Sequence, residues 1–349
     1  MLACSYYIIV LFLSIPLTCQ ERNTTDVADI RDENHKALKY VAFLLFTIFL
    51  LYGIISNILL AIVFYRRQDN HYNLEFILIA SQLIICNFIA FLPQVIVVLP
   101  EMLQAKNSLY AEQTIWINQT FSAFNNFSLF AILHFSFLVT LNRFVVLILP
   151  KYSALFKSAW LYFVIIFVWL STLVNSTVDF YYCIRSFRVS NLSWIRVCTK
   201  QPNTIFMSIH YLWLLFLPIA MFVMYIIIFC SIRRIRYFAL DILNNQDNTA
   251  VSIKRRVNKA RNGVYERSML IQAALTCGVL EIRPIIFYFL PPIVIKIFGK
   301  GANIPLGIFI NCYIIFFYAA LPTVHFFCNR RARNILKYQF LQSKIEIKK

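Results

Sequence analysis

Seven long apolar stretches constrain this chain more than any other feature of its sequence. They cover roughly residues 40–65, 74–100, 121–149, 159–180, 204–232, 268–297 and 302–328. Each is long enough for an α-helix that crosses a bilayer, which needs about 20 apolar residues. The chain is 60% hydrophobic and 14% charged, whereas soluble domains usually carry about 25% charged residues. These features predict an all-α membrane protein, built as a bundle of seven transmembrane helices.

An eighth apolar stretch, residues 6–19, is too short to cross a membrane comfortably and ends before the polar run QERNTTD. It predicts a cleaved signal peptide over residues 1–19, followed by an extracellular tail over residues 20–38. The first residues, MLACS, lack the positive charge that usually opens a signal peptide. A retained signal anchor is therefore the alternative.

The distribution of positive charge predicts the orientation of the bundle. Lys and Arg gather in segments on one side of the seven stretches, above all at 233–267 and 330–349. Because cytoplasmic loops carry the excess of these residues, the N-terminus is predicted outside and the C-terminus inside. The net charge of +18 then reflects topology and contact with anionic membrane lipid, not nucleic-acid binding. On the predicted outer side, Asn23 and Asn191 begin N-x-S/T sequons and are candidate glycosylation sites.

The nine cysteines sort by the same topology. Only Cys183 and Cys198 fall on the predicted oxidising side once a signal peptide is removed, so we predict that they pair. The alternative is two free, buried thiols. The cysteines and histidines show no zinc-binding spacing, and we predict neither a metal nor a cofactor.

An arginine near the inner end of the third stretch gives the first indication of function. A charge inside a membrane costs about 2.5–3.5 kcal/mol even on lenient insertion scales, although an arginine at the membrane edge can extend its charged group to water. Asn142, Arg143 and Phe144 form the run NRF, and Pro150 follows seven residues after the arginine. This arrangement resembles the DRY…P motif of rhodopsin-like G-protein-coupled receptors.

Other residues agree with that resemblance, on the expected stretches and in the expected order. They are Asn57 in the first stretch, Asn87 in the second, Trp169 in the fourth, Pro218 in the fifth, Pro284 in the sixth and Pro322 in the seventh. The resemblance covers about residues 39–340. It implies a receptor bundle over 39–328, then a short amphipathic interfacial helix and cytoplasmic tail over 329–349. A disordered basic tail is the alternative for that last segment.

The departures from the rhodopsin-like pattern point to one branch of receptors. Asn142 replaces an acidic residue, Asn87 replaces an aspartate, LPTVH replaces NPxxY, and Asn118 stands in place of the third-helix cysteine. Together with the high phenylalanine content, these features resemble nematode serpentine chemoreceptors, in the superfamily that includes classes gamma, v and x. Without the third-helix cysteine, the usual disulfide tether of the outer loop cannot form, so we expect a more mobile loop.

The resemblance implies a chemosensory receptor that is not an enzyme. It would lie in the plasma membrane, with sensory-neuron cilia as a candidate location, and its partners would be a small extracellular ligand and a heterotrimeric G protein. The G protein would contact Asn142, Arg143, Phe144 and Pro150. Glu266 is a candidate partner for Arg143 in the inactive state.

Six polar residues in the outer half of the bundle are candidates for the ligand pocket. By the family fold, Asn125, His210, Glu281, Arg283, Tyr288 and Asn311 would converge there. Glu281 and Arg283 are two residues apart on a helix, so they cannot face each other and need separate partners. Asn125 stands where amine receptors carry an aspartate, which argues against an amine ligand. An odorant, an acid attracted by Arg283 and a short peptide stay open.

Other interpretations of these residues and of the whole chain are also open. The polar residues could have structural roles, with Arg283 reaching outward, His210 bonding a backbone group and the asparagines bridging helices. The chain could be a multi-pass transporter or channel, which would show a continuous polar path across the bundle. It could also be a peptide-hormone receptor of the same fold.

Overall fold

The computed structural model of the chain describes residues 29–65, 74–104, 114–156, 159–198, 204–244, 275–329 and 332–337. The predicted signal peptide, Asn23 and Glu266 lie outside the described residues. The expectations that concern them therefore stay predictions.

Six helices in the described residues are long and apolar enough to cross a membrane, and a bent pair of helices makes a seventh. The six are α2 (Lys36–Tyr65), α3 (Leu74–Pro93), α6 (Ile115–Ile148), α7 (Ala159–Tyr182), α8 (Thr204–Asn244) and α11 (Asn303–Cys328). In the bent pair, the helix of residues 275–284 continues through η4 (Ile285–Phe289) into α10 (Leu290–Phe298). Short turns lie at η1 (Glu33–His35), η3 (Pro150–Phe156) and η5 (Lys300–Ala302). The predicted seven-helix architecture is confirmed.

Two of the spans change their helical winding directly after a proline. Pro93 ends α3 before the π-helical turn η2 (Gln94–Val98), which leads into α4 (Leu99–Leu103). Pro284 precedes the π-helical turn η4 in the same way. Proline has no N–H to donate to the helical ladder, so the regular winding is interrupted there. In the sixth span, the helices on either side of the break differ in direction by 47°.

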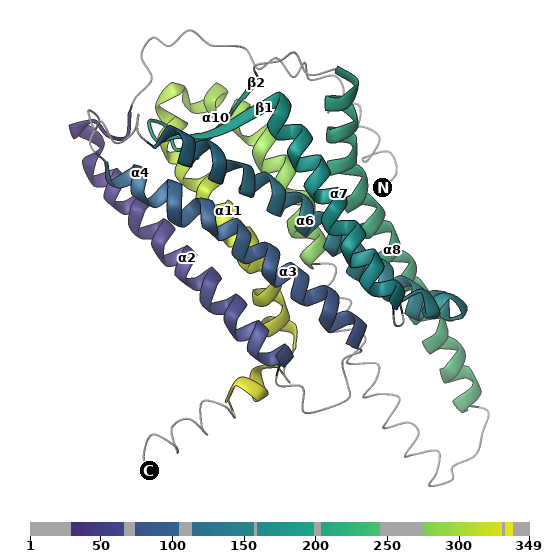
Figure 1. Ribbon diagram of the computed structural model, residues 1–349. Helices are drawn as coiled ribbons and strands as arrows, with labels where there is room; N and C mark the ends of the chain where they lie inside the picture. The colour runs from purple at the N-terminus through teal and green to yellow at the C-terminus, as the bar shows by residue number, and fades with distance from the viewer. Residues whose placement is uncertain are drawn as a thin grey trace, which may run out of the picture.

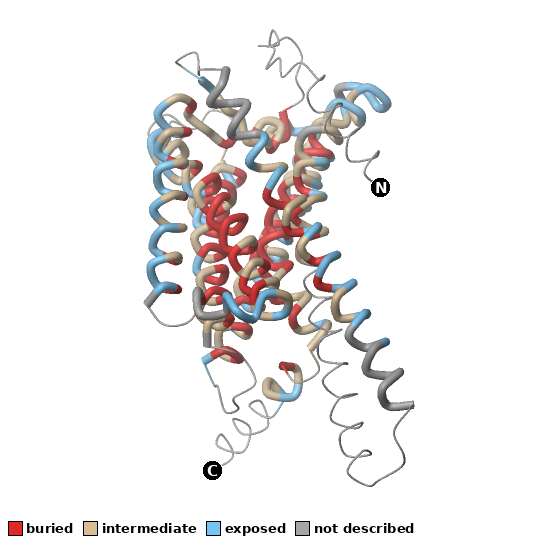
Figure 2. The backbone as a smooth tube through the Cα atoms, turned by 90° about the vertical axis from the view of Figure 1, so that its right-hand side faces the viewer, coloured by how far each residue is buried: buried red, intermediate tan, exposed pale blue. Residues whose placement is uncertain are grey.

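The helices pack around α6, which contacts α3, α7 and α8. Figure 2 shows the buried residues concentrated along the middle of the bundle and exposed residues along its outer helices. Phe130, Phe135 and Tyr318 are among the largest fully buried side chains. Exposed side chains on α7, such as Phe163 and Phe167, are apolar, as expected for a surface that faces lipid.

A two-stranded antiparallel hairpin is the departure from the all-helical prediction within the described part of the chain. It consists of β1 (Cys183–Arg188) and β2 (Ser193–Cys198) and lies at one end of the bundle (Figure 1), where β1 contacts α6 and α7. Cys183 stands opposite Cys198 and forms a disulfide with it, their Cα atoms 4.0 Å apart. The predicted pairing is confirmed. We call this end of the bundle the hairpin end, and the opposite end, where α6 carries Arg143, the Arg143 end.

Two helical segments extend past the last turns of the bundle at the Arg143 end. The helix α8 continues to Asn244, which lengthens the fifth span beyond its apolar stretch. Residues 332–337 form a short helix after α11, within the predicted amphipathic segment. Arg333 Nη1 donates hydrogen bonds of 2.6 Å to the carbonyl oxygens of Phe326 and Phe327. These bonds satisfy carbonyl groups that the end of α11 would otherwise leave without a partner.

Candidate functional site

A side-chain amide of α6 holds the hairpin against the bundle. Asn118 Nδ2 donates to the Phe187 carbonyl at 3.0 Å, and Asn118 Oδ1 accepts from the Phe187 N–H at 2.8 Å. Asn118 Nδ2 also donates to Glu101 Oε1 of α4 at 2.6 Å. The outer loop is therefore attached to the third helix by hydrogen bonds in place of the usual disulfide, and the expectation that this loop is more mobile stays a prediction. An amide carries both donors and an acceptor, so it can match both backbone groups of a strand residue.

The turn of the hairpin contacts α11. Asn311 Nδ2 donates to the carbonyl oxygens of Leu192 at 2.6 Å and Gly307 at 2.8 Å. Trp194 Nε1 donates to Asn311 Oδ1 at 3.1 Å. A Cβ atom on Gly307 would lie 2.2 Å from the Asn191 carbonyl oxygen, so this close approach requires glycine. Asn191 is half-buried here, less open than on a free loop, and its glycosylation stays a prediction.

Asp179 of α7 anchors the base of the hairpin, although it is not among the site residues predicted from the sequence. Its carboxylate pairs with Arg185 of β1 at 3.4 Å and with Arg196 of β2. It also accepts a hydrogen bond of 2.8 Å from Asn126 Nδ2 of α6. Because an acid within an apolar stretch is costly unless it is paired, the position of Asp179 near the end of the fourth stretch was the signal that could have identified it.

Two of the predicted ligand-site residues approach each other through Tyr318 of α11. The Tyr318 hydroxyl donates to Asn125 Oδ1 at 2.7 Å, and the guanidinium of Arg283 lies 6.0 Å from the centre of the Tyr318 ring. Arg283 also lies over the rings of Phe317, at 4.7 Å, and Phe287, at 5.4 Å. Its side chain is buried. The alternative in which Arg283 reaches outward is therefore not what the structure shows.

The remaining predicted ligand-site residues do not join this group among the described side chains. Asn311 bonds the hairpin turn, a structural role that differs from the bridge between helices in the structural alternative. Glu281 is half-buried and forms no ion pair with a described residue. His210 belongs to α8 and Tyr288 to η4, but their side chains lie outside the description. The assignment of all six residues to a ligand pocket stays a prediction.

Asn57 and Asn87 form the centre of a buried polar network. Asn87 Nδ2 donates to Asn57 Oδ1 at 2.9 Å. Asn57 Nδ2 in turn donates to the carbonyl oxygens of Gly53 at 2.8 Å and Tyr318 at 3.2 Å. The backbone of Tyr318 thus meets this network, while its side chain meets Asn125. The motif asparagines therefore join α2, α3 and α11 directly beneath the candidate ligand residues.

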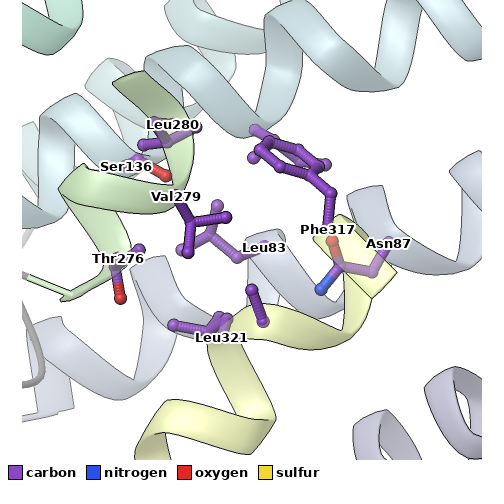
Figure 3. Close-up of a pocket in the computed structure, with 10 residues that line it drawn as sticks. Leu83, Asn87, Ser136, Thr276, Val279, Leu280, Phe317 and Leu321 are labelled. Carbon is purple, nitrogen blue, oxygen red and sulfur yellow. The ribbon is translucent and has the colours of Figure 1, made fainter. Parts of the chain in front are cut away.

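A small cavity borders Asn87, between α3, α6, the helix of residues 275–284 and α11 (Figure 3). It measures about 20 Å³, room for about one water molecule. Its walls are mostly hydrocarbon and include Ile132, Phe317 and Leu321; Ser136 is among the polar residues that line it.

The other helix motif residues take structural positions. Trp169 of α7 donates from Nε1 to Gln82 Oε1 of α3 at 3.0 Å and stacks on Phe127 with ring centres 5.7 Å apart. Pro218 and Pro322 are buried inside α8 and α11. These contacts join neighbouring helices and form no site of their own.

At the Arg143 end, the guanidinium of Arg143 lies 4.2 Å from the centre of the Phe76 ring of α3. Phe76 meets Phe64 of α2 edge to face, and Phe64 meets His325 of α11 in the same way, with ring centres 6.2 and 5.6 Å apart. A row of contacts therefore runs from α6 through α3 and α2 to α11.

The other predicted coupling residues are close to Arg143 in the sequence. Asn142 is buried, Phe144 is half-buried, and Pro150 is exposed at the start of η3. One turn before Arg143, the Thr140 hydroxyl lies 3.0 Å from the Tyr225 hydroxyl of α8. Contact of these residues with a G protein stays a prediction.

Residues 46–299 match a family model described as serpentine type 7TM GPCR chemoreceptor Srx. The match begins within α2, ends just after α10, and covers well over half of the 349 residues. The predicted resemblance to serpentine chemoreceptors is confirmed, and the match specifies class x. A search of curated proteins found no match.

Proposed function

Because the chain belongs to the Srx family of serpentine seven-transmembrane chemoreceptors, we propose that it binds an extracellular ligand near the hairpin end and activates a heterotrimeric G protein at the Arg143 end. The family match is the observation that carries this proposal. It identifies a multi-pass membrane protein and a receptor family without enzymatic activity. It also favours a receptor over the transporter or channel that composition alone allows.

The hairpin end is the extracellular one in this proposal. A disulfide such as Cys183–Cys198 persists in oxidising compartments, which supports an outside position for the hairpin. Arg233 and Arg234 are exposed on α8 toward the other end, and such residues gather on the cytoplasmic side. We assign the chain to the plasma membrane, with sensory cilia as the proposed location.

A ligand signal would pass along contacts that the bundle already contains. Arg283 and Asn125 both meet Tyr318, whose backbone meets Asn57 and, through it, Asn87. A ligand that repositioned Tyr318 would therefore disturb the polar network between α2, α3 and α11. This path links the ligand end to the middle of the bundle.

Arg143 would be the residue that the G protein meets. In the structure its guanidinium lies on the Phe76 ring, a kind of contact that contributes about 0.5–2 kcal/mol depending on solvent exposure. Because Asn142 is neutral, the residue before Arg143 supplies no counter-charge. Movement of Arg143 toward a G protein would break this contact with Phe76. Glu266 remains the proposed additional partner in the inactive state.

The proposal can be tested with the full chain in a heterologous cell that expresses a panel of Gα subunits. We expect at least one compound of a ligand screen to change the second-messenger level. Arg143→Ala should abolish this response while surface expression stays largely intact. Lys296→Ala removes an exposed cation at the hairpin end and serves as the control, with an unchanged response. Normal G-protein activation by Arg143→Ala at matched surface levels would contradict the role of Arg143.

A further inference from the structure

We propose that Arg283 anchors an acidic ligand, an organic molecule that carries a carboxylate on an apolar body. This inference rests on the proposed function and deepens it, because it names the chemical class of the ligand. Its starting observation is that Arg283 is 9% exposed and that its Nη1 has no hydrogen-bond partner among the described residues.

No described acidic side chain neutralises Arg283. Glu281 is two residues away and forms no ion pair with a described residue, as expected for two positions on different sides of a helix. The buried acid at the hairpin base, Asp179, is paired with two arginines of the hairpin. Glu101 is engaged with Asn118. The described part of the bundle therefore presents a buried cation without an anion.

The surroundings of Arg283 offset this charge incompletely. Phe287, Phe317 and Tyr318 place their rings around the guanidinium, and the negative faces of aromatic rings attract a cation. Aromatic rings accept no conventional N–H···O hydrogen bond, so the unpartnered Nη1 keeps its cost of desolvation. An ionisable residue that a span retains at such a cost is a functional candidate, because functional sites commonly give up stability.

The geometry of the Arg283 guanidinium favours a carboxylate as the ligand group. A guanidinium presents parallel N–H donors that fit the two oxygens of a carboxylate, and this charge-assisted pair is strong and directional. The three rings would accept hydrocarbon or an aromatic group beside the acid. A cationic amine would meet repulsion from Arg283 and would find no charged partner in Asn125.

The position of Arg283 connects ligand binding to the rest of the bundle. It immediately precedes Pro284 and the π-helical turn η4, where the sixth span bends by 47°. Single π-helical turns often mark functional positions in helices. Arg283 also lies against Tyr318, which bonds Asn125 with its hydroxyl and Asn57 with its backbone. An acid bound to Arg283 would thus act at the bend and at the polar network together.

The test measures binding to the purified full chain in lipid nanodiscs, without a G protein, at constant pH and ionic strength. The probes are benzoate with benzamide and octanoate with octanamide, so each acid has a neutral partner of the same size. We expect at least one acid to bind about tenfold more tightly than its amide. Arg283→Gln should abolish that preference. Arg188→Gln, which removes an exposed arginine of the hairpin, should keep it.

The two probe pairs distinguish the apolar body of the ligand. A preference in the benzoate pair indicates an acid with an aromatic body, and one confined to the octanoate pair indicates an acid with an alkyl chain. Equal binding of acids and amides in the wild-type chain would overturn the proposal. Retention of the acid preference by Arg283→Gln would overturn it as well.

A second variant covers the case in which Arg283→Gln folds poorly. Arg283→Met removes the charge but keeps a long apolar side chain against the three rings. Since it no longer buries an unpaired cation, its ligand-free melting temperature should equal or exceed that of the wild-type chain. A melting temperature well below wild type for both variants would show that the cation has a stabilising partner, and would refute the proposal.

The outcomes separate this inference from the proposed function. Acid-selective binding through Arg283 without any G-protein activation would leave the inference standing and contradict the proposed function. Activation of a G protein by a neutral ligand, with the same response in Arg283→Gln, would support the proposed function and contradict the inference about Arg283.

Discussion

Asn118 of α6 and Phe187 of β1 exchange two hydrogen bonds, so that a side-chain amide pairs with the hairpin as a neighbouring strand would. The same amide reaches Glu101 and thereby adds α4 to the junction. Together with Asp179 at the base and Asn311 at the turn, Asn118 attaches the hairpin to three different helices.

Removal of the Asn118 amide should loosen the hairpin. Asn118→Ala leaves backbone groups of Phe187 without their partner, which costs about 1–3 kcal/mol when such groups are buried. We expect a lower melting temperature of the detergent-solubilised chain and faster hydrogen exchange over residues 183–198. Thr120→Ala is the matched control, because residues 118–120 read N-Q-T, an N-x-T sequon that this variant removes while it keeps the Asn118 amide. Equal behaviour of the two variants would show that the Asn118 hydrogen bonds do not hold the hairpin.

A methyl group at Gly307 should displace the hairpin turn. The added Cβ would lie 2.2 Å from the Asn191 carbonyl oxygen and 3.2 Å from Leu192 Cβ, and overpacking of this kind costs about 1–3 kcal/mol. Gly307→Ala should therefore reduce thermal stability and surface expression. Gly278→Ala, where no atom lies within 4 Å of the new Cβ, should change neither. Comparable stability of both variants would mean that the turn does not pack on α11 this closely.

Sodium should not stabilise this chain more than potassium does. The cavity beside Asn87 has walls that are mostly hydrocarbon, and Asn87 supplies a neutral amide that is already bonded to Asn57. A buried cation needs a counter-charge or several oxygen ligands to offset its desolvation. The melting temperature should be the same in sodium chloride and potassium chloride, and Asn87→Ala should lower it equally in both salts. A sodium-specific rise that Asn87→Ala abolishes would contradict this prediction.

Peptide mapping under non-reducing conditions should recover Cys183 linked to Cys198, with Cys230 free for alkylation. Opening the disulfide should increase hydrogen exchange more at Cys183 and Cys198 than at Phe187, because Asn118 continues to hold the Phe187 N–H. Recovery of either cysteine in another linkage would refute the pairing. Uniform loss of protection along both strands would show that the disulfide alone maintains the hairpin.

The spans, the family and the Cys183–Cys198 pair could be predicted from the sequence, because they depend on stretch length, charge distribution and motif order. The contacts of the hairpin could not. The Asn118 tether depends on how β1 meets α6, and the glycine requirement at Gly307 depends on how closely the turn approaches α11. Neither relationship leaves a local pattern along the chain.

The candidate ligand site was partly predictable for the same reason. Helical spacing predicts the depth of Asn125, Arg283 and Asn311, but the choice of partner depends on side-chain packing. Asn311 bonds the hairpin turn, whereas Asn125 and Arg283 meet at Tyr318. Asp179 was different, since an acid in an apolar stretch is visible in the sequence and the general rule for such residues applies to it.

The local character of the disulfide has a consequence for biogenesis. Its cysteines are 15 positions apart in one loop. In the proposed orientation, the bond can form as soon as that loop reaches the oxidising lumen, before the ribosome has synthesised α11. The contacts of the hairpin with Asn311 and Gly307 must wait until the seventh span is inserted. Covalent closure and docking of the hairpin are thus separate steps of maturation, and a nascent chain truncated after α8 should already contain the oxidised pair.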